Sequence, residues 1–192
     1  SRVVTVDLHA GQIQGFFDIP VDHLAAAPVL ASYFREQEIE DLVVVSPDLG
    51  GVTRARIMAD FLHAPIAIIE KRRPCPGCAE VMNLIGEVEG KTALLIDDIV
   101  DTAGSLCEGA KALHERGAKH VLAACSHAIL SDPAVERINA SVIDQLVITD
   151  SIPVPPEKQS DKLVTLSLAQ SLADVIVRIQ SHRSVSLLFN HH

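Results

Sequence analysis

The sequence predicts an α/β fold, a doubly wound and mainly parallel sheet flanked by helices. Short β-branched runs alternate along the chain with stretches of helical periodicity, which is the order expected of β-α-β units. Several of these runs are apolar at every position, as in strands that helices cover on both faces. The 192 residues, 48% of them hydrophobic, suffice for one substantial domain and exclude a disordered chain.

Six short runs are the predicted strands of this sheet. They are Val3 to Leu8, Leu42 to Val45, Ile66 to Ile69, Ala93 to Ile96, Val121 to Cys125 and Leu146 to Thr149. A loop rich in proline and acidic residues follows the sixth run. Leu163 to Leu168 and a helix over Leu172 to Ile179 then close the fold.

Helical periodicity occupies two of the intervals between these strands. Thr53 to His63 and Ser105 to Arg116 each place their apolar residues on one side, so we interpret both as crossover helices. Gly117 follows the second, where a left-handed helix cap is expected. A further helix is expected to open at Asp132-Pro133, because a capping residue and a proline favour the first turn.

One interruption breaks the alternation. Val81 to Val88 is predicted to return through a tight turn at Glu89-Gly90-Lys91 into Thr92 to Ile96, as a local hairpin. Ahead of it, the run from Lys71 to Cys78 holds three basic residues, two prolines and a glycine. Such a run is neither helix nor central strand, so we expect a mobile basic loop.

Charge and hydropathy narrow the function classes. Lys and Arg total 16 against 25 Asp and Glu, a formal net charge of −9. A surface this acidic repels a phosphate backbone, which argues against nucleic acid as a partner. No apolar run approaches the roughly 18 residues that span a bilayer. We therefore expect a soluble protein without a membrane partner.

The cysteines favour a reduced, cytoplasmic protein. The chain has Cys75, Cys78, Cys107 and Cys125, and no signal peptide precedes the first strand, so a disulfide framework is not expected. The Cys75-Pro-Gly-Cys78 spacing is that of a metal knuckle or a redox motif, but it lacks a second ligand pair nearby. The role of Cys75 and Cys78 stays open.

The segment from Leu94 to Leu106 is chemically the most informative. An apolar strand runs into Asp97-Asp98, and Asp101 and a Thr102-Ala-Gly-Ser105 turn then open a helix. Backbone N–H groups at such a turn suit a monophosphate, and the acids before it suit sugar hydroxyls. A sugar phosphate has both parts. The alternative is that the two acids only cap or solvate a loop.

This segment closely resembles the phosphoribosyl pyrophosphate loop of type I phosphoribosyltransferases and of the ribose-phosphate pyrophosphokinase family. Its Asp-Thr-Ala-Gly-Ser form looks like the pyrophosphokinases. Three further segments carry the same resemblance: Val6 to Phe17, Val45 to Gly51 and Ser184 to Phe189. Together they run the length of the chain.

The resemblance implies a type I phosphoribosyltransferase-like fold and a domain organisation. Residues 1–190 are expected to be the carboxy-terminal, phosphoribosyltransferase-like domain of a pyrophosphokinase, with the amino-terminal domain absent ahead of Ser1. His191-His192 is interpreted as the remnant of a purification tag. Family members assemble, so dimers that associate further are expected of the full-length protein.

The resemblance also assigns residues to the site. Asp97, Asp98, Asp101 and the turn residues Thr102, Ala103, Gly104 and Ser105 are implied to bind ribose 5-phosphate. His9 and Asp48 are implied to hold Mg²⁺ with the ATP phosphates, directly or through water. Chemistry alone favours Asp48 as a metal ligand, because a hard cation prefers carboxylate oxygen. For His9 the alternative is a histidine that packs in the core or caps an element.

Lys71 and Arg73 match the two basic residues of the family's catalytic loop. In the implied reaction, the C1 hydroxyl of ribose 5-phosphate attacks the β-phosphorus of ATP, and AMP and phosphoribosyl pyrophosphate form. Basic side chains on a closing loop would stabilise the transferred charge. The sequence departs from many members at Cys75 and Cys78.

Four further positions, Gln14, Asp22, Ser184 and Ser186, match a phosphate-effector site at a subunit interface. The isolated chain is expected to be nearly inactive, because the adenine pocket of the family lies largely in the absent domain. Two alternatives to the pyrophosphokinase remain. One is a phosphoribosyltransferase, although no base-recognising insertion is visible, and the other is a non-catalytic, synthetase-associated regulatory subunit.

Overall fold

The computed structural model describes residues 1–72 and 81–185 and contains two β-sheets and five α-helices within those ranges. The strands are β1 (Val3–Val6), β2 (Val21–Leu24), β3 (Leu42–Ser46), β4 (Ile66–Arg72), β5 (Val81–Ile85), β6 (Thr92–Val100), β7 (His120–Ala128), β8 (Gln145–Thr149) and β9 (Leu163–Leu166). The helices are α1 (Ala27–Glu36), α2 (Val52–Leu62), α3 (Gly104–Glu115), α4 (Ala134–Ala140) and α5 (Ala169–Gln180), with 3-10 turns η1 (Gly11–Phe16) and η2 (Pro156–Lys158).

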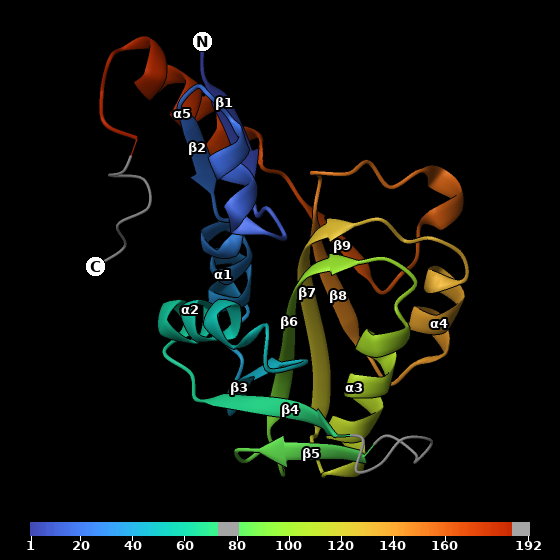
Figure 1. Ribbon diagram of the computed structural model, residues 1–192. Coiled ribbons are helices and arrows are strands. Elements are labelled where there is room, and N and C mark those ends of the chain that lie inside the picture. The colour runs from blue at the N-terminus through green and yellow to red at the C-terminus, as the bar shows by residue number, and fades with distance from the viewer. Residues whose placement is uncertain (73–80, 186–192) are drawn as a thin grey trace.

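The larger sheet has seven strands in the order β5-β4-β3-β6-β7-β8-β9 (Figure 1). All neighbours in it are parallel except β4 and β5. The predicted α/β fold with a mainly parallel sheet is therefore confirmed. The strand predictions from Leu42 onward fall within β3, β4, β6, β7 and β8, and the run from Leu163 contains β9.

Helices cover both faces of this sheet. Along β6, Leu94 and Ile96 pack in one core with residues of α1 and α2, while Ala93 and Leu95 pack in another with residues of α3 and α4. Successive side chains of a strand point to opposite faces, so an unbroken apolar run is what a doubly covered strand requires. This explains why β6 carries no polar residue between Ala93 and Ile96.

The topology places a crevice between β3 and β6. From β3 the chain passes through α2 to β4, and from β6 it passes through α3 to β7, so the two connections leave in opposite directions and on opposite faces. Ligands of open α/β sheets bind at such a switch point, beyond the carboxyl ends of the strands. The turns after β3 and β6 both lie there.

The predicted hairpin partner is wrong. β5 pairs antiparallel with β4, from Ile68 opposite Ile85 to Arg72 opposite Val81, and β6 pairs with β3 and β7 instead. The nine residues of β6 are largely buried between parallel neighbours, so the antiparallel strand is left to the sheet edge. The basic loop predicted from Lys71 to Cys78 lies mostly outside the described residues.

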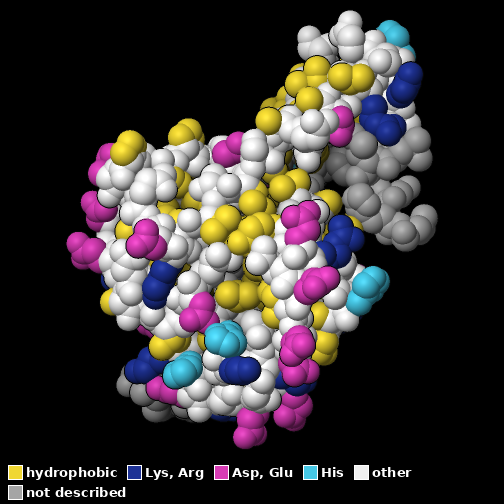
Figure 2. Space-filling model, turned by 180° about the vertical axis from the view of Figure 1, so that it is seen from behind, with side chains coloured by type: hydrophobic (Ala, Val, Ile, Leu, Met, Phe, Trp, Pro, Cys, Tyr) yellow, Lys and Arg dark blue, Asp and Glu magenta, His cyan; other side chains and the backbone are white. Residues whose placement is uncertain are grey.

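The first predicted strand does not join the large sheet. β1 pairs in parallel with β2, which sequence reasoning missed, and the pair forms a separate two-stranded sheet. α5 packs against it around Leu24, Val175 and Val185. We call this unit, residues 1–24 and 169–185, the arm; it projects from the larger sheet (Figures 1 and 2).

The helix predictions were accurate to one to three residues at each end. α2 and α3 match the two predicted crossover helices, and Gly117 has the left-handed φ of +88° expected after α3. At α4 the cap prediction fails, because Pro133 occupies the N-cap position and no side chain caps the helix. α1 was not predicted. Within the described residues, no helix is long and apolar enough to cross a bilayer.

Candidate functional site

The turn between β6 and α3 has the geometry of an anion site. Ala103 takes a left-handed conformation, φ +58° and ψ +10°, and α3 starts at the next residue. A left-handed residue followed by a helical one gathers successive N–H groups around one concavity. Within the described residues, the N–H groups of Ala103, Gly104 and Ser105 have no hydrogen-bond partner. The turn is therefore open to an anionic ligand, and the positive end of α3 favours one.

The paired acids lie at the carboxyl end of β6 and share one cation. Arg54, on α2, approaches Asp98 Oδ2 at 2.8 Å through Nη2 and Asp97 Oδ1 at 3.3 Å through Nη1. Asp97 Oδ1 also accepts a hydrogen bond from the backbone N–H of Asp98. The reading of both acids as mere loop caps does not explain this ion pair. Arg54 was missed by sequence reasoning, because nothing in a helical run marks one arginine as facing a distant strand.

The two carboxyls have opposite pKa shifts. Burial raises the pKa of Asp97 to about 6, against the favourable charge of Arg54. Burial acts on Asp98 in the same direction, but the hydrogen bond with His9 and the charge of Arg54 outweigh it and lower its pKa. Two carboxyls in contact resist double ionisation, so any shared proton rests on Asp97. Asp98 is the permanent acceptor of the pair.

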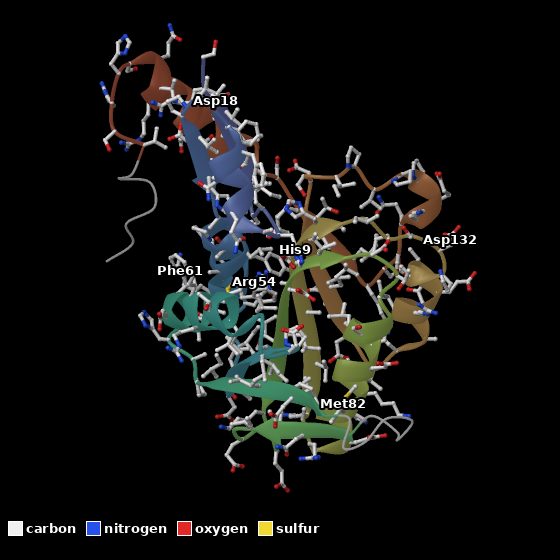
Figure 3. All side chains as sticks on the ribbon, in the orientation of Figure 1. His9, Asp18, Arg54, Phe61, Met82 and Asp132 are labelled. Carbon is white, nitrogen blue, oxygen red and sulfur yellow. The ribbon has the colours of Figure 1, made fainter. Side chains whose placement is uncertain are left out.

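His9 reaches this pair from the arm. Its Nδ1 lies 2.8 Å from Asp98 Oδ2, although three quarters of the imidazole is exposed. Arg54 approaches the same oxygen, and Figure 3 labels the two residues near each other. Asp7, two residues before His9, anchors this segment to neighbouring elements by hydrogen bonds. Asp7 accepts hydrogen bonds from the Ser126 hydroxyl and from the Ala26 N–H through Oδ2.

Asp48 shapes the turn after β3. Its Oδ1 accepts the Gly51 N–H at 2.8 Å, and its carbonyl oxygen accepts the Ser46 hydroxyl. A Cβ on Gly51 would lie 2.9 Å from Ser46 Oγ, so only glycine closes this turn without displacement. The turn is thus preformed, with Asp48 exposed at the crevice.

The predicted metal residues do not form a metal cluster by themselves. Asp48 is engaged by Gly51 and His9 by Asp98, and the described ranges hold no group of three or more His, Cys, Asp or Glu placed to share an ion. Mg²⁺ usually takes one or two carboxylates and completes its octahedron with water and substrate phosphates. The donor set fits an ion that arrives with a nucleotide rather than one held by protein alone.

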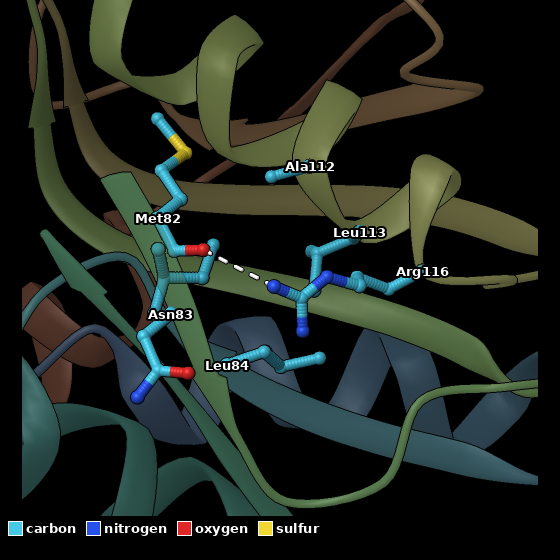
Figure 4. A pocket seen from close by; sticks show the side chains of 7 residues that line it. Met82, Asn83, Leu84, Ala112, Leu113 and Arg116 are labelled. Carbon is cyan, nitrogen blue, oxygen red and sulfur yellow. Dashed lines mark hydrogen bonds between the residues drawn. The ribbon is translucent and has the colours of Figure 1, made fainter. Parts of the chain in front are cut away.

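A cavity of about 240 Å³ adjoins the acid pair. Its walls combine apolar side chains of α1 and α2 with polar residues. The polar residues include Asp7, His23, Arg54, Asp97, Asp98 and Ser126. A second hollow, between β5 and α3, measures about 10 Å³ and is crossed by the Arg116 hydrogen bond to the Met82 carbonyl (Figure 4). The second hollow has room for about one water. The larger cavity borders the acid pair but is not lined by Thr102 to Ser105, so it lies next to the anion turn and does not include it.

The remaining predicted residues are dispersed. Asp101, Thr102 and Ser105 are exposed on the turn beside the acid pair. Gln14, Asp22 and Ser184 lie on the arm, where Asp22 pairs with Arg2 at 2.7 Å and the Ser184 carbonyl accepts from Arg178. The side chain of Lys71, and all of Arg73, Cys75, Cys78 and Ser186, lie outside the described part of the chain.

Known proteins share this sequence and fold. The family model described as phosphoribosyl synthetase-associated domain matches residues 70–190. Ribose-phosphate pyrophosphokinases from Oceanobacillus iheyensis and Bacillus subtilis are 60% and 58% identical over 190 residues, which is 99% of this chain. The chain spans 60% of the length of these curated relatives.

The structural comparison agrees. The crystal structure of phosphoribosylpyrophosphate synthetase from Mycobacterium smegmatis superposes with a TM-score of 0.87 at 40% identity, over 94% of this chain and 59% of that one. TT1426 from Thermus thermophilus, at 20% identity and a TM-score of 0.53, shares the fold alone. With a family match over residues 70–190, this chain belongs to the phosphoribosyl synthetase-associated domain family.

Proposed function

We propose that this chain provides the sugar-phosphate half of a ribose-phosphate pyrophosphokinase. The reaction transfers the pyrophosphoryl group of ATP to the C1 hydroxyl of ribose 5-phosphate and yields phosphoribosyl pyrophosphate and AMP. The names of relatives 58% to 60% identical to this chain support this reaction over that of a phosphoribosyltransferase. It serves nucleotide biosynthesis.

One observation carries the proposal, the juxtaposition of an open anion turn and a charged carboxylate. The three N–H groups of Ala103, Gly104 and Ser105 suit the 5-phosphate. Asp98, whose pKa is lowered, remains an acceptor for ribose hydroxyls at neutral pH. Asp98 lies near the carboxyl end of β6 and the turn follows that strand directly, so we infer that a single pentose phosphate spans them.

The acid pair supports binding and orientation. Arg54 holds both carboxylates in place, which limits the side-chain entropy lost when the sugar binds. Each hydroxyl donated to a carboxylate is a charge-assisted hydrogen bond and fixes the rotation of the sugar ring. We infer that the C1 hydroxyl is thereby aimed at the crevice where the nucleotide phosphates would lie.

Mg²⁺ belongs to the proposal as an ion shared with ATP. Asp48 and His9 would contribute one oxygen and one nitrogen ligand, directly or through water, beside triphosphate oxygens. When bound, Mg²⁺ neutralises charge on the transferred phosphates. Because Asp48 Oδ1 and His9 Nδ1 already accept or share hydrogen bonds, their remaining atoms, Oδ2 and Nε2, are the proposed ligands.

Lys71 and Arg73 are the proposed catalytic cations. The β4 backbone runs through Lys71 to Arg72, at the antiparallel edge of the sheet. Positive charge delivered onto the transferred phosphoryl oxygens acts mainly in the transition state. This role is offered on the strength of the sequence resemblance and the likeness to the curated relatives.

The wider proposals concern assembly and regulation. We propose that the full-length protein forms dimers that associate further, and that it works in the cytoplasm. We also propose a phosphate-effector site at Gln14, Asp22, Ser184 and Ser186. Gln14, Asp22 and Ser184 all belong to the arm, each in a different segment, so the proposed site would lie on this unit. The ion pair with Arg2 offsets the negative charge of Asp22, which would otherwise repel a bound phosphate.

An assay of a completed protein tests this function. A chimera would join this chain to the segment of the Bacillus subtilis relative that it lacks, and AMP release would be measured with ATP, Mg²⁺ and ribose 5-phosphate. We expect turnover, and we expect Lys71→Ala to lower kcat far more than it changes the KM for ribose 5-phosphate. A folded chimera that consumes no ATP would contradict the proposal and favour the regulatory-subunit alternative.

A further inference from the structure

Arg137 contacts the anion turn from outside, across an interface between two helices. The residue is in the last turn of α4, and its Nη1 donates to the carbonyl oxygen of Thr102 at 2.9 Å. A Cβ built on Gly104 would lie 3.5 Å from the same nitrogen. The guanidinium therefore covers the back of the turn, although nothing in the sequence links α4 to it.

The helix that carries Arg137 is held rigidly against the sheet. Its neighbours Ala134 and Ile138 are fully buried against the sheet, so α4 cannot rotate away from α3 without opening the core. Lys162 Nζ donates to the carbonyl oxygens of Ile138 and Ser141 and closes the end of the helix. An arginine on such a support holds its carbonyl partner in one direction.

The geometry of one peptide unit links this contact to the ligand. The peptide bond between Thr102 and Ala103 is trans, so its C=O and N–H point in opposite directions. Arg137 holds the C=O, so the Ala103 N–H points away from the guanidinium, toward the concave side of the turn. That N–H is the first of the three donors proposed for the phosphate.

The same contact bears on the left-handed residue. Alanine pays a steric cost at φ +58°, and a turn that contains it has competing conformations that remove the strain. A charged donor on the Thr102 carbonyl stabilises the turn as it stands. We propose that Arg137 is a positioning residue, which preorganises the Thr102–Ala103 peptide so that its N–H binds the phosphate of the sugar substrate. This inference rests on the proposed sugar-phosphate function.

Arg116 provides a matched control. It also donates one hydrogen bond from an exposed guanidinium to a backbone carbonyl, that of Met82, at 3.2 Å. Its partner, drawn in Figure 4, is on β5, which is an edge strand of the larger sheet. Arg137→Ala and Arg116→Ala thus remove the same charge and the same kind of bond, and they differ in whether the anion turn is involved.

The experiment combines calorimetry with ¹⁵N NMR on the 192-residue chain. Arg137→Ala should weaken ribose 5-phosphate binding by about tenfold, the equivalent of one lost charged hydrogen bond, while Arg116→Ala stays within about twofold. In the ligand-free protein, the amide resonances of Ala103 and Gly104 should shift or broaden in Arg137→Ala alone. Arg137→Lys should fall between wild type and Arg137→Ala, and replaces the latter if it fails to fold.

The outcomes of this experiment separate a positioning role of Arg137 from the other roles. Unchanged affinity in Arg137→Ala would overturn the assignment, and so would weaker binding with unmoved amide resonances, which would make Arg137 a direct phosphate ligand. If the wild-type chain bound no ribose 5-phosphate, the proposed function would fail. The amide resonances would still decide whether Arg137 orders the turn, so the two failures are distinguishable.

Discussion

The β6–α3 turn and the arm differ in how they are built. The turn is one contiguous segment, anchored in a strand whose residues Leu94 and Leu95 are fully buried. The arm joins the first strands of the chain to α5 around a small core, and it leaves Phe16, Ile176 and Val177 largely exposed. Figure 2 shows hydrophobic side chains on its surface. The comparison teaches that the proposed sugar-phosphate turn is supported by a buried strand, whereas the arm has a small core and leaves apolar side chains exposed.

The largest expected effect concerns the turnover of the chain alone. The chain alone should release AMP from ATP and ribose 5-phosphate about 10³-fold or more slowly than the full-length Bacillus subtilis relative, because phosphoryl transfer depends on holding both reactants in line. Tyr33 and Phe34 pack against each other in the core and offer no stacking surface for a purine. Comparable turnover by the chain alone, purified free of longer enzyme, would show that the nucleotide seat lies within it.

The proposed sugar-phosphate turn is tested at its strained residue, Ala103. Ala103→Val places a β-branched side chain at φ +58°, where L-residues already pay roughly 1–2 kcal/mol, so the turn should change conformation. Binding of ribose 5-phosphate should weaken by about tenfold or more. Ala103→Gly is the control, because glycine adopts this φ freely, and it should bind as well as wild type. Equal affinity of the valine variant would exclude the turn as the phosphate site.

The two regions also differ in how many of their features could be predicted from the sequence. The anion turn and its acids were predicted because strand, turn and helix follow one another in the chain, and each residue type has a local reason. Arg54 and Arg137 were missed, since their partners are 43 and 35 residues away and depend on helix packing. β2 and the β4–β5 pairing were also missed. A four-residue strand such as Val21–Leu24 has too few positions for its period to be recognised.

The buried charge of Asp97 lowers the stability of the folded chain, and a neutral substitution should remove this penalty. The folded-state pKa of Asp97, about 6, lies above the ordinary 3.8, so the folded chain binds more protons than the unfolded chain between these values. Stability therefore falls as pH rises through that window. Asp97→Asn should stabilise the ligand-free chain by about 1–2 kcal/mol at pH 7.5, with the gain vanishing near pH 4. Denaturant unfolding at both pH values checks this, and a destabilised variant at pH 7.5 would refute it.

The smallest effect concerns the attachment of the arm. Ser126→Ala removes the hydroxyl that donates to Asp7 and should cost about 1 kcal/mol. Hydrogen exchange should accelerate in β1 and β2 and stay unchanged in β6 and β7, because the bond joins the arm to an otherwise intact sheet. Uniform acceleration in all four strands would mean that the arm and the sheet open as one unit.

The central claim is that this chain carries a complete sugar-phosphate site. Calorimetric titration of ribose 5-phosphate into the chain tests it most directly, beside Asp98→Asn and the control Asp174→Asn, which changes an exposed acid of α5. We predict one binding site, loss of about 1–3 kcal/mol in Asp98→Asn, and no change in the control. No binding to the wild-type chain, or equal binding by wild type and Asp98→Asn, would contradict the account.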